Sequence, residues 1–139
     1  MATLGRIRQT IADAIETNAD VPAWPTIPSS IVPPCVYVRP ISQTRETMNR
    51  QGTGHISYEF ELIVVAALAD TFNGQEVLDE LISTGTNQSI VDVFDDQYVL
   101  GLEETTVTAE GWGDYTTTTI GERQYMTATI ECSVYTRAQ

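Results

Sequence analysis

A proline-rich segment followed by two strand-like stretches constrains the fold more than any other feature of this chain. All six prolines lie between Pro22 and Pro40. Because proline fixes φ and lacks a backbone donor, this segment is expected to run extended without regular structure of its own. Residues 35–38 and 55–68 have strand character. Residues 41–54 between them are mostly polar, which predicts a long loop, and long loops on small β-domains commonly carry binding surfaces.

Hydrophobic periodicity predicts the other elements. Apolar residues recur at helical spacing in residues 4–17, and residues 55–64 alternate with a period of two. The same reasoning predicts helices near 73–82 and 89–94 and strands within 100–112 and 123–136, these two strands being separated by a loop with four consecutive threonines. The order α-β-β-α-α-β-β predicts a single α+β domain over residues 1–139. We expect a four-stranded, mainly antiparallel sheet with helices on one face and a long loop between the first two strands.

The charge balance of the chain is strongly acidic. It has no lysine, and its seven basic residues are arginines, against 19 carboxylates, for a formal charge of −12. Such a surface repels nucleic acid, because phosphate binding depends on neutralising cations, and it is equally unsuited to an anionic membrane surface. The apolar run Ile63–Ala69 is too short to cross a bilayer, and no secretory leader is recognisable. We therefore expect a soluble protein that neither grips DNA nor enters a membrane.

The sequence predicts no catalytic, cofactor or metal site. The one histidine, His55, has no second histidine with which to complete a metal site, and no nucleophile elbow is present. Adjacent carboxylates such as Asp95 and Asp96 do not form a natural acid–base pair. Cys35 and Cys132 are expected to be small buried hydrophobes, and the sequence leaves open whether they are neighbours. These observations predict a protein without enzymatic activity.

Two surfaces are candidates for contacts with other subunits. Arg39, Arg45 and Arg50 form the only basic cluster, in or beside the long loop. The cluster is either a solvated loop or, as we favour, an arm that docks on an acidic neighbour such as another copy of the chain. The last predicted strand carries an alternating face of Tyr, Thr, Glu and Ser from Tyr125 to Tyr135. That face suits either solvent or a neighbouring subunit.

Six stretches of the chain together resemble one family of structural proteins. The first three are the short amphipathic helix Leu4–Glu16, the proline-rich strand entry IVPPCVYVRP at Ile31–Pro40 and the alternating strand Phe60–Ala66. The other three are the helix VLDELISTG at Val77–Gly85, which ends at glycine, the one-turn helix Ser89–Phe94 and the final alternating strand TATIECSV at Thr127–Val134. In these features, which are spread over most of the length of the chain, it resembles the tail terminator proteins of long-tailed phages that infect actinobacteria.

The resemblance implies a virion protein, assembled in the host cytoplasm, that forms a ring at the head-proximal end of the tail tube, usually of six copies. Such a ring stops tube growth and joins the tail to the head. Its partners would be further copies of itself, the tail-tube protein and the head–tail connector or stopper protein, without any cofactor. Genome DNA would pass through the lumen without specific binding, which an acidic or neutral wall favours. Glu59 and Glu61, on the polar side of the long strand, are expected to face this channel.

Two alternative functions remain open. One is a head–tail stopper or a tail-tube subunit of the same architecture. The other, from a different class, is a small hydrolase or ligand-binding domain, which would need a pocket with converging polar groups. For a ring we also expect residues 41–54 to be mobile in the free subunit and ordered in the assembly, because they have few apolar anchors. Asp95 and Asp96 are candidates for the acidic side of that contact.

Overall fold

The computed structural model describes residues 4–19, 21–26, 33–47, 54–67, 71–83, 90–94, 98–99, 105–120 and 122–138. Within these residues the chain forms three helices and six strands, in the order α1 Leu4–Ala19, β1 Ala23–Trp24, β2 Cys35–Thr47, β3 Gly54–Ala67, α2 Thr71–Ile82, α3 Ile90–Val93, β4 Tyr98–Val99, β5 Thr105–Ile120 and β6 Arg123–Ala138.

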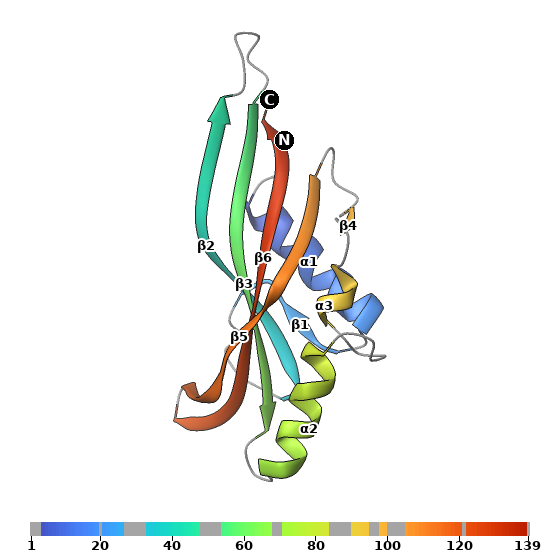
Figure 1. Ribbon diagram of the computed structural model, residues 1–139, viewed down its shortest axis with the longest axis vertical. Helices are drawn as coiled ribbons and strands as arrows, with labels where there is room; N and C mark the ends of the chain where they lie inside the picture. The colour runs from blue at the N-terminus through green and yellow to red at the C-terminus, as the bar shows by residue number, and fades with distance from the viewer. Residues whose placement is uncertain are drawn as a thin grey trace.

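The strands form one mixed sheet in the order β1-β2-β3-β6-β5-β4 (Figure 1). The four long strands, β2, β3, β6 and β5, are antiparallel to their neighbours. Two strands of two residues each border them, β1 parallel to β2 and β4 antiparallel to β5. The α+β class is therefore confirmed, and the long strands are the four that the sequence predicts. The short strands were not predicted, and β1 makes the sheet mixed rather than wholly antiparallel.

The long loop predicted between the first two strands is largely strand. β2 continues past Pro40 to Thr47, and Ser42–Thr47 pair with Gly54–Glu59 of β3. The register shifts between Pro40 and Ser42, and a proline is tolerated at such an irregularity on a strand with a largely open edge. The prediction of a loop over 41–54 is thus wrong for residues 41–47 and 54, and residues 48–53 lie outside the described part of the chain.

The predicted threonine-rich loop is also strand. β5 runs from Thr105 to Ile120, and the four consecutive threonines, Thr116–Thr119, pair with Gln124–Thr127 of β6. Threonine is β-branched and suits a half-exposed strand. The hydroxyls of Thr118 in β5 and Thr127 in β6, which are diagonal neighbours, lie 2.6 Å apart. The hairpins β2–β3 and β5–β6 consequently extend toward opposite ends of the molecule (Figure 1).

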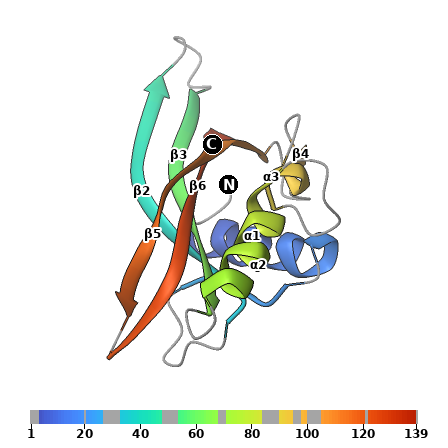
Figure 2. The same cartoon turned by 60° about the horizontal axis from the view of Figure 1, so that its bottom comes forward.

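The main core lies between the sheet and the helices. α1 buries Ile7, Ile11 and Ile15 completely, from the stripe that its helical spacing predicts. They belong to the same buried cluster as Phe60 and Leu62 of β3, and each such side chain stabilises the fold by about 1.5–3 kcal/mol. All three helices lie on one side of the sheet, as expected (Figure 2). We call the opposite side the open face.

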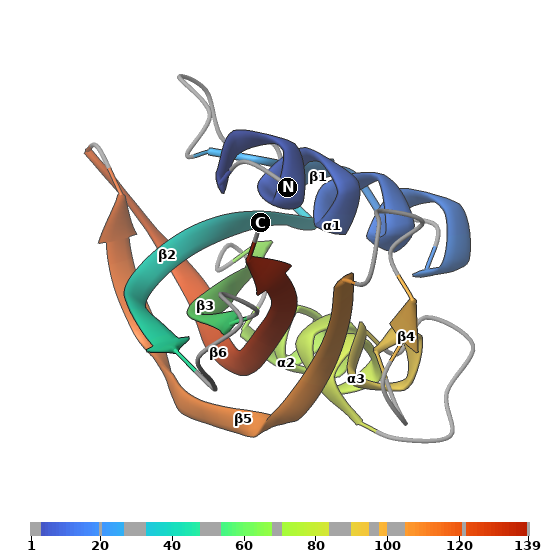
Figure 3. The same cartoon turned by 90° about the horizontal axis from the view of Figure 1, so that it is seen from above.

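Seen from above, the long strands bend and twist (Figure 3), as the right-handed twist of β-strands leads one to expect. The two cysteines lie on opposite faces of this sheet. Cys35 packs in a small cluster on the open face, whereas Cys132 belongs to the main core; both are buried, and neither forms a disulfide. They are therefore not neighbours. Among the described residues, every helix is too short or too polar to cross a membrane.

Candidate functional site

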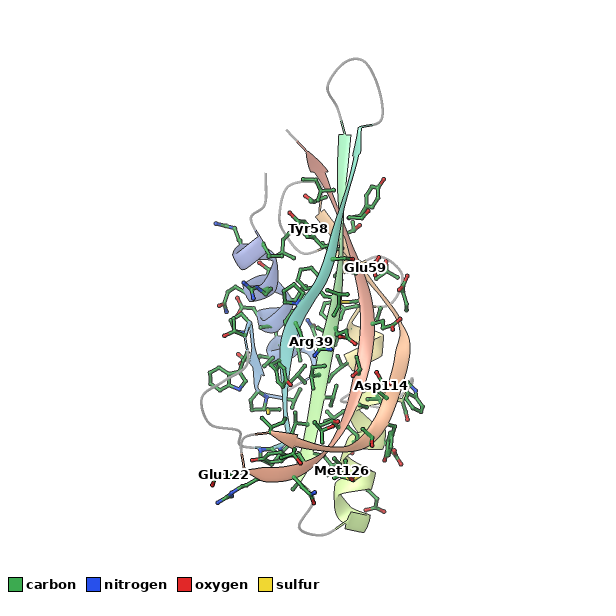
Figure 4. All side chains as sticks on the ribbon, turned by 90° about the vertical axis from the view of Figure 1, so that its left-hand side faces the viewer. Arg39, Tyr58, Glu59, Asp114, Glu122 and Met126 are labelled. Atoms are coloured by element: carbon green, nitrogen blue, oxygen red, sulfur yellow. The ribbon has the colours of Figure 1, made fainter. Side chains whose placement is uncertain are left out.

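Cross-strand pairing arranges the open face in rows. In one row Arg39, Glu61, Glu131 and Gly111 follow one another from β2 to β5. This row and Glu59 beside it make the upper half of the open face acidic, and Figure 4, which looks onto this side of the molecule, labels Arg39 and Glu59. The lower half is apolar and threonine-rich, formed by Cys35, Tyr37, Ile63, Val65, Ile120, Tyr125, Thr127 and Thr129.

Arg39 and Glu61, which the sequence assigned to a subunit contact and to the channel respectively, form an ion pair with each other across β2 and β3. The hydrogen bond to Glu61 raises the pKa of the Arg39 guanidinium, so the arginine stays charged. Because the Arg39 side chain is 56% exposed, the pair adds only about 0–1 kcal/mol to stability. Glu59 accepts a hydrogen bond of 3.2 Å from the Ser133 hydroxyl. Glu59 and Glu61 thus both lie on the open face, as the alternation of residues along β3 predicts.

The two tyrosines proposed for a subunit contact differ in exposure. Tyr125 is only 8% exposed because it packs with Ile63 and Val65 in the apolar half of the open face. Tyr135 is 41% exposed at the other end of β6. The strand face that the sequence treats as uniform is therefore half buried, and Tyr135 is the one of the two with ring surface available to a partner.

The remaining predicted contact residues are only partly described. Arg45 lies in β2 opposite Ile56 of β3, and its side chain lies outside what the structure describes. Arg50 falls within residues 48–53, and Asp95 and Asp96 fall within residues 95–97, which also lie outside the described residues. Of the three arginines in the cluster, Arg39 is the one whose side chain the structure describes, and it has an internal partner.

Two free strand edges are the principal feature that sequence reasoning missed. β1 borders β2 only at Val36 and Tyr37, so in the described part of the chain no strand pairs with the outer edge of β2 from Val38 to Thr47. β4 borders β5 only at Thr106 and Val107, and the amide of Ala109 donates to the carbonyl of Phe94 at 3.1 Å. Residues 110–120 of β5 likewise have no outer partner strand among the described residues. Open edges expose backbone donors and acceptors that can pair with another chain.

The free stretch of β5 contains an irregular segment that carries an exposed aromatic side chain. The register of β5 against β6 shifts between Ala109 and Gly111 and again between Gly113 and Thr116. Gly111 has φ 150° and Asp114 has φ 52°, conformations that glycine, and to a lesser extent aspartate, tolerate best. Trp112 is 53% exposed, and its ring centroid lies 5.9 Å from that of Tyr115. The glycines on both sides of Trp112 are the sequence signal for this bulge.

Tyr115 ties the bulged segment to the helical layer. Its hydroxyl donates a hydrogen bond of 2.9 Å to the carboxylate of Asp79 in α2. Partial burial and this acceptor together raise the pKa of Tyr115 to about 12. The phenol therefore remains neutral and remains a donor at physiological pH, so the irregular part of β5 is held in place.

The described residues contain no group of three or more histidine, cysteine, aspartate or glutamate side chains that could hold a metal ion. Burial raises the pKa of the Cys132 thiol to about 12, so at neutral pH this cysteine is not a nucleophile. The geometry thus offers surfaces for assembly, namely two open edges and an acidic half-face. A scan against models of known protein families found no match, and a search of the curated proteins found no significant relative.

Proposed function

We propose that this protein assembles head to tail into a closed ring that acts as the tail terminator of a long-tailed phage. The single observation that carries the proposal is the pair of unlike free edges, on β2 and β5, at opposite sides of one sheet. A contact between unlike surfaces is heterologous, and repeated by rotation it generates a ring when the rotation closes. The assignment to a tail terminator rests on the sequence resemblance in addition to this geometry.

Strand direction supports repetition by rotation. The long strands alternate in direction from β2 through β3 and β6 to β5, so β5 runs opposite to β2. A second copy placed with its β2 beside the free edge of β5 continues the antiparallel alternation. No copy has to be inverted, and the same step applies at every interface. The backbone groups exposed on both edges then find partners, which gives the contact its driving force.

The open face supports a channel for DNA. In the proposed ring the helices lie outside and the open face lines the lumen, where Glu59, Glu61 and Glu131 form its acidic half. Carboxylates do not neutralise phosphates, so DNA gains no salt-dependent affinity from them. The internal pairing of Arg39 with Glu61 removes one cation from this wall. The ring can therefore surround the genome without retaining it.

The experiment that tests the proposal is native mass spectrometry of the purified chain, together with negative-stain imaging of the chain mixed with phage tail tubes. The expected result is one closed ring species, bound to one end of each tube. A two-fold dimer as the only assembly would contradict the ring. Polymerisation of the chain alone into long tubes would instead favour a tail-tube subunit, because a tube subunit must stack on itself axially and a terminator must not.

A further inference from the structure

The two free edges lie toward opposite ends of the sheet. On β2 the free stretch runs from Val38 toward the β2–β3 hairpin, and on β5 it comprises residues 110–120, toward the β5–β6 hairpin (Figure 1). A neighbouring copy that continued the sheet without a shift would bring Ser42 beside Thr108, because both lie in the row of Ser133 of β6. β4 borders the adjacent residues of β5. The free edges therefore meet only when the neighbouring copy is displaced along the strands.

The direction of the backbone groups restricts this displacement. The Val36 amide donates outward from β2 to the carbonyl of Pro22, and the Ala109 amide donates outward from β5 to the carbonyl of Phe94. In an antiparallel ladder, residues in alternate rows point their N–H and C=O groups to the same side. The outward residues, traced row by row through β3 and β6, continue with Val38, Gln43, Arg45 and Thr47 on β2 and with Trp112, Thr117 and Thr119 on β5. Both sets occupy the same alternate rows, so the two edges can pair only at a displacement of an even number of rows.

A displacement of eight rows brings the two free stretches together. Thr118 of β5 lies in the row of Tyr125 of β6, whereas Ser42 of β2 lies in the row of Ser133, eight residues further along β6. Displacing the neighbouring copy by those eight rows places its Ser42 beside Thr118. Because the number of rows is even, outward backbone groups face each other, and the open faces of both copies lie on the same side of the continued sheet.

The neighbouring even displacements fit less well. At eight rows residues 39–47 of one copy pair with residues 112–120 of the next, and none of these residues borders β1 or β4. At six rows Ile120 would come beside Tyr37, which β1 already borders. At ten rows Ile120 would come beside Ser42, and the first free residues of β2 would be left without partners. Eight rows is therefore the displacement that uses both free edges fully.

Charges at this displacement are complementary. The turn between β5 and β6, which carries the exposed Glu122, comes beside the start of the free edge of β2. A pocket of about 310 Å³ lies there, with Arg8 of α1 and Arg39 in its lining, and the Nε atom of Arg8 is buried without a hydrogen-bond partner in the described structure. Guanidinium groups match carboxylates. Further along the pairing, Arg45 comes beside the bulge that contains Asp114.

We propose that neighbouring copies join with a displacement of eight residues, so that residues 112–120 of one copy pair antiparallel with residues 39–47 of the next. The inference rests on the proposed head-to-tail ring and adds the register of its interface. The occupant of each edge is a second copy because the free stretches match in length, backbone direction and charge. A closed sheet requires such a displacement, since its strands must tilt against the axis. The β5–β6 hairpin also bends away from the helices, in the direction in which a sheet around a lumen curves (Figure 1).

Engineered disulfides test this register. In the displaced pairing Ser42 and Thr118 form a non-hydrogen-bonded pair, whose Cα atoms lie about 4.5 Å apart, within the range that a disulfide spans. Ser42→Cys/Thr118→Cys should therefore give, on mild oxidation, a ladder of covalent oligomers that ends at the ring. An internal bridge is excluded because β2 and β5 are separated by β3 and β6. The wild-type chain should give no ladder, since Cys35 and Cys132 are buried.

A crossover of partners makes the register test sharper. Thr44→Cys/Thr116→Cys is the next pair in the same register and should crosslink as well. Ser42→Cys/Thr116→Cys combines one position from each pair, and its diagonal separation of about 7–8 Å is too long for a disulfide. We expect its crosslinked fraction to be at least about fivefold lower, because that separation exceeds the disulfide range. Ser42→Cys/Thr108→Cys reports on the sheet continued without a shift and should also crosslink weakly.

Native mass spectrometry of the reduced variants separates the register from the ring. If the variants form rings and Ser42→Cys crosslinks best with Thr116→Cys or Thr108→Cys, or if neither predicted pair crosslinks, the displacement of eight is overturned while the ring itself stands. Absence of a ring from the wild-type chain would instead contradict the proposed function.

Discussion

The free edge of β2 and the free edge of β5 differ in nearly every respect. β2 is regular apart from one shift at Pro40, and its charged residues give +1, whereas β5 is bulged twice and its charges give −2. β5 is also fixed to α2 through Tyr115 and Asp79, and it exposes Trp112. Edges that differ in charge and shape are poor partners for themselves and suitable partners for each other. This difference favours a head-to-tail contact over pairing of two like edges.

The largest expected effect comes from making the two edges alike in charge. Glu110→Arg with Asp114→Arg changes the charge of β5 from −2 to +2, so that both edges are basic. We expect loss of the ring, because juxtaposed like charges at an interface cost several kcal/mol. Both residues are exposed, so the melting temperature of the isolated subunit should fall only slightly, by the strain of placing an arginine at the φ of 52° that Asp114 adopts. Native mass spectrometry measures the loss of the ring, and thermal melting of the same samples measures the stability of the subunit. Rings at wild-type yield would show that edge charge does not select the partner.

A second double substitution changes the charge of Arg45, in β2, and of Arg50, which follows β2 in the sequence. Arg45→Glu with Arg50→Glu should weaken ring assembly and leave the fold intact, since loop and edge charges steer contacts more than they stabilise a subunit. The loss should be smaller than that caused by Glu110→Arg with Asp114→Arg, because Arg39 stays in place. The ring yield at a series of salt concentrations measures this loss. A yield equal to wild type at low salt would argue against electrostatic docking by this hairpin.

A smaller effect, confined to the β5 edge, is expected on the stability of the isolated subunit. Tyr115→Phe removes the hydrogen bond to Asp79 that holds the bulged part of β5 against α2. We expect a loss of about 0.5–1.5 kcal/mol in the free energy of unfolding, measured by urea titration. Thr119→Val on the same strand, exposed and outside the bulges, is the matched control and should cost less. Equal costs for the two variants would mean that Tyr115 does not anchor this segment.

The smallest effect is a pH dependence of the same anchor. The pKa of Tyr115 is raised from 10.0 to about 12 in the folded chain. The folded state therefore holds this proton more tightly than the unfolded state, so the stability it contributes is complete below pH 10 and is lost as the pH rises toward 12. Thermal melting of wild type and Tyr115→Phe across this range should show a steeper decline for the wild type. If the two curves declined in parallel, the loss of stability at alkaline pH would come from other groups.

Periodicity explains how much of this fold the sequence predicts. The buried stripe of α1 and the alternation in β3 and β6 arise from burial, and burial leaves a hydrophobic pattern in the sequence. The outer parts of β2 and β5, at Ser42–Thr47 and Thr116–Thr119, are held by backbone pairing to a neighbouring strand. Such pairing needs no apolar residue, so both segments have the composition of loops. β1 and β4, at two residues each, are too short to show a period.

The candidate site was less predictable, for a related reason. Arg39 meets Glu61 only because residue 39 of β2 pairs with residue 61 of β3, and register between strands is not visible in either strand alone. The free edges depend on where β1 and β4 stop. Charge could be predicted from the sequence, but its distribution over two edges required the sheet order.

The most direct test of the head-to-tail account blocks one edge in each of two chains. Ile41→Asp places a charge on the free edge of β2, and Trp112→Asp does the same on β5; both native side chains are 53% exposed, so each subunit should still fold. Trp24→Asp, on β1 and outside both free stretches, is the control and should still form rings. Native mass spectrometry of each blocked chain alone and of their mixture is the measurement. The account predicts monomers from each chain alone and a dimer of one copy of each in the mixture, because one β2 edge and one β5 edge remain intact. A dimer formed by either blocked chain alone would show that like edges pair, and would contradict the head-to-tail ring.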